Sequence, residues 1–185
     1  MGASVASDPD TRSADELPLL ELLTEDLATY DRRLTEPGLW AVLTHRLGAR
    51  ARGIRQAPLR ALAQRCQRTL AHGVDLLWGI RLAETTELGR RVRIWHSGCV
   101  QLEARAIGDD VHIRHDTTLG GVRVRDAAPE QWPTIEARVE LGVGVSVLGP
   151  VRVGHDSFVA ANSLVLKSVA PHSTVLGVPA RVVPL

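Results

Sequence analysis

The first half of the chain carries apolar residues at the spacing of amphipathic helices. From residue 17 to about residue 77 they recur three and four positions apart, as in Leu20, Leu23 and Leu27, which places them on one face of a helix. Pro37-Gly38 separates successive helices. Residues 1–16 mix small, polar and acidic side chains without an apolar period. We therefore expect a disordered N-terminus over 1–16 and a helical domain over 17–78.

A different period begins after Gly79. Aliphatic residues then recur at every sixth position, with one shift of a single residue and one longer interruption, and they are Leu82, Leu88, Ile94, Val100, Ile107, Ile113, Leu119, Ile135, Leu141, Val147, Val153, Val159 and Val165. Strands repeat every two residues and helices every 3.6, so neither keeps this register. We expect each hexad to form one short strand and one corner, and three hexads to close a triangular coil of stacked parallel strands.

The long interruption at residues 120–133 is polar, contains prolines and falls out of the six-residue register. Such a segment should leave the coils as an external loop. The expected fold is therefore mainly β with α: a helical N-terminal part followed by a parallel β-helix over 79–185, with the loop at 120–133 and a C-terminal tail at 170–185.

Composition limits the partners of the protein. The 185 residues are 44% hydrophobic and 23% charged, which is typical of a globular chain with its own core. Its 22 basic and 21 acidic residues give a net charge of +1, so no overall field favours nucleic acid or an anionic membrane. No apolar run reaches the roughly 18 residues of a membrane-spanning helix. With two distant cysteines and no secretion pattern, we expect a cytoplasmic protein.

Several motifs resemble, in order, those of the serine acetyltransferase family. They are Pro37-Gly38-Leu39, His45-Arg46-Leu47, Gly79-Ile80, Gly108-Asp109-Asp110-Val111, His115 with Thr118-Leu119-Gly120-Gly121, Leu148-Gly149-Pro150 and Gly177-Val178-Pro179-Ala180-Arg181. The resemblance covers about residues 20–185. It implies a left-handed β-helix, a homotrimer that is either free or paired into a dimer of trimers, and acetyl-CoA as acyl donor in the groove between two prisms.

The resemblance implies general-base catalysis by His96, which matches the residue that takes the proton from the attacking acceptor hydroxyl. Histidine suits this role because its ordinary pKa lies near neutral pH. Glu103 is the favoured partner of His96 among four carboxylates, Glu84, Glu103, Asp109 and Asp116. His115 is either an assisting, substrate-side residue or a structural one. Cys99 leaves a covalent acyl-cysteine route open, although the family does not use one.

The chain departs from the family at the acceptor end. Arg81 stands where the resemblance places the acid that supports the base, Trp95 replaces the aspartate before the base, and Trp132 replaces a second active-site histidine. Two indoles and a guanidinium offer flat apolar walls and a fixed cation. We therefore expect Arg81, Trp95 and Trp132 to bind an acceptor that is larger or more anionic than free serine.

The resemblance also implies which residues bind the cofactor. Small residues would let the pantetheine approach the backbone, and two cations would bind the CoA phosphates; the residues are Gly120, Gly121, Gly142, Gly144, Ala161, Lys167 and Arg181. No metal is expected, because the histidines lack the paired spacing of a zinc site on one element. His155 and His172, for example, each stand alone in the sequence.

Together these features predict a CoA-dependent acyltransferase that acts on the hydroxyl or amine of a small molecule. Two alternatives stay open. One is a sugar O-acetyltransferase of a polysaccharide pathway. The other is a CoA-binding trimeric scaffold without turnover, which the missing acid at position 81 and the missing second histidine favour.

Overall fold

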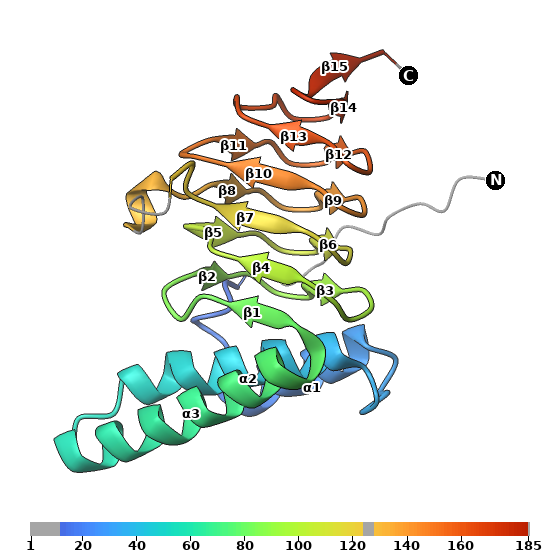
Figure 1. Ribbon diagram of the computed structural model, residues 1–185. Helices are drawn as coiled ribbons and strands as arrows, with labels where there is room; N and C mark the ends of the chain where they lie inside the picture. Colours follow the sequence, from blue (N-terminus) through green and yellow to red (C-terminus); the bar gives the residue numbers. More distant parts are fainter. Residues whose placement is uncertain (1–11, 124–127, 185) are drawn as a thin grey trace.

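The computed structural model describes residues 12–123 and 128–184. Three helices lie across one end of a solenoid, and the C-terminus lies at the other end (Figure 1). Residues 1–11 of the expected disordered N-terminus lie outside the described part. In residues 12–16 the Glu16 N–H donates to the Ser13 carbonyl at 3.1 Å, and the Arg12 guanidinium pairs with Glu21 at 2.7 Å.

The helical part consists of α1 (Leu19–Thr29), α2 (Pro37–Arg52) and α3 (Ala57–Trp78). A proline occupies the first turn of both α2 and α3, where its missing N–H costs no helical hydrogen bond. Gly79 ends α3 in the left-handed conformation (φ 64°), which glycine adopts without strain. None of the described helices is both long enough and apolar enough to cross a membrane.

The strands of the solenoid form three faces, and within each face neighbouring strands run parallel except at β15. Face 1 contains β1 (Ile80–Leu82), β4 (Val100–Leu102), β7 (Thr118–Gly120), β10 (Ser146–Leu148) and β13 (Leu164–Val165). Face 2 contains β2 (Glu87–Leu88), β5 (Ala106–Ile107), β8 (Thr134–Ile135) and β11 (Arg152–Val153). Face 3 contains β3 (Arg93–Ile94), β6 (His112–Ile113), β9 (Glu140–Leu141), β12 (Phe158–Val159), β14 (Thr174–Leu176) and the antiparallel β15 (Arg181–Val183).

The six-residue pattern explains the core of the solenoid. Eleven of the thirteen predicted positions are at most 1% exposed, and they are Ile94, Val100, Ile107, Ile113, Leu119, Ile135, Leu141, Val147, Val153, Val159 and Val165. In-register pairs such as Ile113 with Leu141 stack these side chains from one coil to the next. Burying each contributes about 1.5–3 kcal/mol. The predicted three-sided parallel coil is confirmed, and the external loop leaves it after β7.

Helix α2 packs directly on the first coil. A Cβ at Gly38 would lie 2.4 Å from the Ile94 carbonyl oxygen, so only glycine permits this approach. Arg46, which is 4% exposed, donates to Asp26 at 3.1 Å and to the Leu88 carbonyl at 2.6 Å. Burial raises the pKa of Asp26, and Arg46 opposes that shift. Breaking such a buried pair costs about 3–5 kcal/mol, so these contacts fix the helices on the solenoid.

The edge between faces 2 and 3 carries one left-handed, non-glycine residue in each coil. These residues have φ between 53° and 58°, and in order they are Arg91, Asp110, Arg138, Asp156 and His172. Arg91 binds both carboxylate oxygens of Asp110, at 2.7 and 2.8 Å, and Arg138 binds both oxygens of Asp156, at 2.6 and 2.7 Å. We call this column the charge ladder; it places His172 next to the last carboxylate.

His45 lies between α2 and the first coils and is 5% exposed. Neither ring nitrogen has a hydrogen-bond partner in the described structure. Burial lowers the pKa of His45 to about 4, and the charges of Arg46 and Arg52 act in the same direction. The carbonyl groups of Ala83 and Thr86 favour the protonated form slightly. His45 is therefore neutral in the folded protein at neutral pH.

This burial predicts a pH-dependent stability. An unfolded histidine titrates near 6.5, so between about pH 6.5 and 4 the unfolded chain binds more protons than the folded one. The free energy of unfolding should fall by up to about 3 kcal/mol from this group as the pH falls through that window. In urea titrations His45→Gln should remove this part of the slope, whereas His72→Gln, at an exposed site on α3, should keep it. Equal slopes in the two variants would contradict the assignment.

Candidate active site

His96 occupies a corner between faces 3 and 1. It follows β3 in the left-handed conformation (φ 66°), and its side chain is exposed. The corner is fixed from both sides, because the Gly98 N–H donates to the Trp78 carbonyl at 3.0 Å and the Gly98 carbonyl accepts from Asp116 N–H at 3.1 Å. The sequence thus holds an accessible imidazole on a rigid turn.

His115, one coil further, lies beside His96. The two rings meet edge to face with 5.7 Å between their centroids. The Nδ1 atom of His115 is buried and has no hydrogen-bond partner among the described residues. Two imidazoles at one corner can hold and pass a proton, and the structure therefore brings together two of the three predicted catalytic residues.

Trp95 packs along its own face rather than pointing freely into solvent. The Arg93 guanidinium lies 3.9 Å from the centroid of the Trp95 ring, and the indole Nε1 donates to His112 Nδ1 at 3.1 Å. Burial lowers the pKa of His112, and the charge of Arg93 acts in the same direction. A neutral His112 with its proton on Nε2 is the form that can accept this bond. Trp95 thus forms a fixed wall.

Arg81 lies on β1 beside the last turn of α3. Its Nε and Nη2 atoms donate to Asp75 Oδ2 at 3.1 and 2.7 Å, and this pairing raises the pKa of Arg81. It lines a cavity of about 240 Å³ with His45, His72 and Asp75. The predicted cation is therefore already paired with a carboxylate of its own chain.

A second cavity, of about 340 Å³, opens on face 1 beneath the external loop. It brings together Glu103, Gly120, Gly121 and the nearly buried Trp132. The Gln101 side-chain amide donates to Glu103 at 3.4 Å. The residues that line this cavity do not include His96, and the pairing of Glu103 with His96 stays a prediction.

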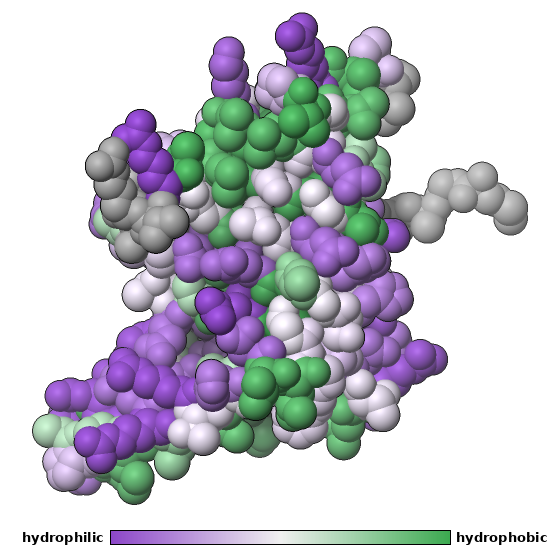
Figure 2. Space-filling view, in the orientation of Figure 1, coloured by the Kyte–Doolittle hydropathy of each residue, from purple (hydrophilic) through white to green (hydrophobic). Residues whose placement is uncertain are grey.

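The other predicted cofactor residues lie along the upper coils. A Cβ at Gly142 would lie 2.6 Å from the Ala161 nitrogen. Contact with the next coil is therefore by itself enough to require glycine at this position. Gly144 turns a corner with φ 70°. Ala161, Lys167 and Arg181 are exposed. Figure 2 shows apolar side chains gathered over these coils, with polar ones below, and the exposed apolar residues near the C-terminus include Leu166, Leu176, Val178 and Val182.

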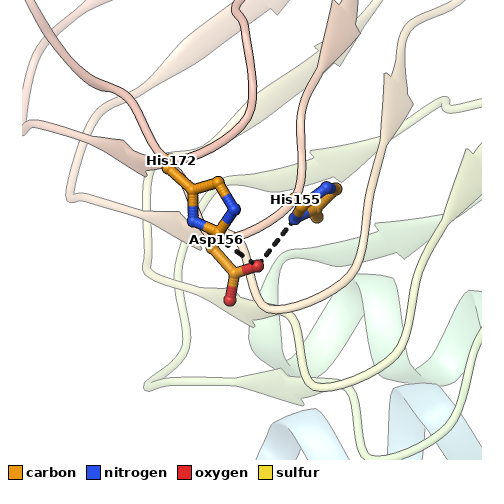
Figure 3. Close-up of side chains that lie close together, drawn as sticks. All are labelled: His155, Asp156 and His172. Carbon is orange, nitrogen blue, oxygen red and sulfur yellow. Dashed lines mark hydrogen bonds and ion pairs between the residues drawn. The ribbon is translucent and has the colours of Figure 1, made fainter.

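The structure also forms a cluster of two histidines and an aspartate that the sequence spacing did not indicate. His155, Asp156 and His172 converge at the end of the charge ladder (Figure 3). The His155 and His172 rings meet at 4.9 Å between centroids. Because they come from successive coils, no spacing on a single element signals them. The coil length, which follows from the six-residue repeat, is the signal that could have paired them.

These features define the class of the protein as a hexapeptide-repeat β-helix with an external loop. No protein-family model matches the chain. A serine acetyltransferase of Mycobacterium tuberculosis is 39% identical over 148 residues, 80% of this chain and 61% of that protein. One of Helicobacter pylori is 33% identical over 169 residues, 89% of this chain and 94% of that protein. This chain therefore belongs to the serine acetyltransferase family.

The solved structures agree with this assignment. The structure of the Brucella abortus serine acetyltransferase in complex with coenzyme A matches with a TM-score of 0.74 and 29% identity, over 89% of this chain and 67% of that chain. The left-handed parallel β-helix inferred from the motifs is thereby confirmed. The chain spans about three fifths of the length of the M. tuberculosis relative.

The two kinds of glycine can be separated by experiment. At Gly120 an added Cβ would lie 3.4 Å from Glu103 Oε2, an ordinary contact, whereas at Gly142 it would strike backbone. Gly120→Ala should change the free energy of unfolding by less than about 0.5 kcal/mol, and Gly142→Ala should lower it by about 1–3 kcal/mol. Urea denaturation measures both. A stable Gly142→Ala variant would mean that this glycine serves a ligand rather than the neighbouring coil.

Proposed function

We propose that the protein transfers an acetyl group from acetyl-CoA to a hydroxyl or amine of a small molecule, with His96 as general base. Membership of the serine acetyltransferase family supports the reaction class, and a related structure is a complex with coenzyme A. The observation that carries the proposal is the exposed His96 imidazole, held on a rigid corner against His115.

The chemistry requires little from the protein because a thioester is already activated. His96 would take the proton of the acceptor as its oxygen or nitrogen attacks the thioester carbonyl. The tetrahedral oxyanion then collapses, the carbon–sulfur bond breaks, and the departing CoA sulfur takes the proton back from His96. The net result is an acetylated acceptor and free CoA. Backbone N–H groups near the site would stabilise the oxyanion.

The cavity beneath the external loop is the proposed location of the pantetheine arm. Gly120 and Gly121 leave the backbone accessible there, which allows close approach. Lys167 and Arg181 are exposed on the coils above and would bind the CoA phosphates. The proposed cofactor-binding residues also include Gly142, Gly144 and Ala161, which lie on the same coils.

The acceptor site is proposed to differ from one built for free serine. Trp132 lies in the same cavity as Glu103, and Trp95 forms a wall stiffened by Arg93. Arg81 already pairs with Asp75, so an anionic acceptor would share the guanidinium with that carboxylate. A larger acceptor with an apolar surface therefore fits these residues better than a small free amino acid does. A sugar hydroxyl is among the acceptors that satisfy this description.

We propose a cytoplasmic trimer in which the edge that carries His96 faces a neighbouring prism. A partner there would cover the exposed His96 imidazole. The helices carry a further apolar groove of about 470 Å³, lined by residues such as Leu43, Leu70 and Trp78. That groove suits the pairing of two trimers, because an uncovered apolar surface favours burial.

A scaffold without turnover is the second candidate function. Two replacements favour it: Arg81 stands where the family has the acid that orients the base, and Trp132 stands where it has a second active-site histidine. The scaffold would keep CoA binding and lose acetyl transfer.

Release of free CoA from acetyl-CoA, followed with a thiol reagent across hydroxyl and amine acceptors, tests the proposal. Acceptor-dependent release should fall by about 10²- to 10⁴-fold in His96→Ala, whereas His172→Ala, whose side chain is 70% exposed and takes no part in the proposed transfer, should keep full activity. CoA binding without release for any acceptor would support the scaffold. Undiminished release in His96→Ala would exclude His96 as the base.

A further inference from the structure

We propose that His155, Asp156 and His172 form a binding site for a divalent transition metal ion such as Zn²⁺, at the edge between faces 2 and 3. Nothing in the acetyl-transfer proposal uses these residues. They offer two imidazole nitrogens and one carboxylate oxygen, and these three ligand atoms all lie within 4.8 Å of one another. The site would join two successive coils near the C-terminal end of the solenoid.

The two histidine nitrogens lie on either side of one carboxylate oxygen. His155 Nδ1 lies 2.7 Å from Asp156 Oδ2, and His172 Nδ1 lies 3.8 Å from the same oxygen (Figure 3). Ligands of a tetrahedral zinc at about 2.0–2.2 Å are separated by roughly 3.3–3.5 Å. To reach that spacing, His155 has to move slightly away from Asp156 and His172 slightly towards it; both side chains are partly free to turn, because they are 41% and 70% exposed.

The backbone holds the two corners in register. The His172 N–H donates to the His155 carbonyl at 2.9 Å, and the His155 N–H donates to Glu136 at 2.9 Å. Asp156 and His172 both occupy the left-handed conformation, with φ of 57° and 55°. A Cβ at Gly154 would lie 2.4 Å from the Pro171 nitrogen, so this glycine lets the two corners approach each other. Ligands on such rigid turns are largely organised before the ion binds.

The ion pair between Arg138 and Asp156 is also compatible with a metal site. Arg138 binds both oxygens of Asp156, and its hydrogen bonds, with that of His155, hold the pKa of Asp156 well below its ordinary value. A carboxylate has lone pairs enough for an arginine and an ion. Arg138 would then orient the ligand, as outer partners of metal ligands do. On binding, the proton of His155 moves from Nδ1 to Nε2, which frees the Nδ1 lone pair.

The donor set selects the class of ion. Two imidazoles and one carboxylate suit zinc, cobalt, nickel or copper, whereas magnesium and calcium require mainly oxygen ligands. With three protein ligands and an exposed edge, water would complete the coordination. The alternative is that the cluster is only the end of the charge ladder, with His172 beside Asp156 as a surface ion pair.

Calorimetric titration of the full chain with Zn²⁺ tests the proposal, with Mg²⁺ as the comparison ion. We expect one zinc ion per chain at this edge and no magnesium binding. His155→Ala, His172→Ala and Asp156→Asn should each weaken zinc affinity at least tenfold. Asp110→Asn is the matched control, because it breaks an equivalent arginine pair on the same ladder and lies outside the cluster of His155, Asp156 and His172; its zinc affinity should equal that of the wild type.

Two further measurements make the outcome decisive. Circular dichroism without metal establishes that each variant folds, and Zn²⁺ should raise the melting temperature of the wild type but not of His172→Ala. His96→Ala should retain the zinc site. Loss of binding in His96→Ala but not in His172→Ala would place the ion at the His96–His115 corner and overturn the proposal. Absence of zinc binding by the wild type would leave only the ladder and equally overturn it.

Discussion

The stacking of aliphatic side chains at every sixth position holds the coils of the solenoid in register. Each inward residue, such as Ile113, lies directly over its counterpart in the neighbouring coil. This register sets the coil length, and the coil length decides which corner residues meet. His96 lies beside His115, and Asp156 lies beside His172, for that one reason. Both histidine clusters therefore lie at corners of the coils, where neighbouring coils bring their side chains together.

The helices contribute by closing one end of the stack. Gly38 permits the approach of α2, and Arg46 ties α1 and the first coil to that helix through a buried ion pair. The junction of α3 with β1 places Asp75 next to Arg81. A position that would otherwise present a free cation is thus neutralised by the helical part, which links the packing of the helices to the candidate acceptor site.

The repeat could be predicted from the sequence because a solenoid is nearly one-dimensional: each inward position depends only on its neighbours one coil away. The corner of His96 followed from motifs. The pairing of Arg81 with Asp75 could not be predicted, because it depends on how α3 meets β1. Nor could sequence distinguish Gly142, which the next coil requires, from Gly120, which faces a cavity. His155 and His172 escaped notice because their contact crosses coils.

We propose that acyl transfer takes place where the His96 edge of one prism meets its neighbour, and a structure determined with bound coenzyme A is the sharpest test. We expect a trimer in which the CoA sulfur lies within hydrogen-bonding reach of His96, in the groove between two subunits, with the pantetheine passing Gly120. A monomer, or a sulfur atom remote from that imidazole, would exclude this arrangement.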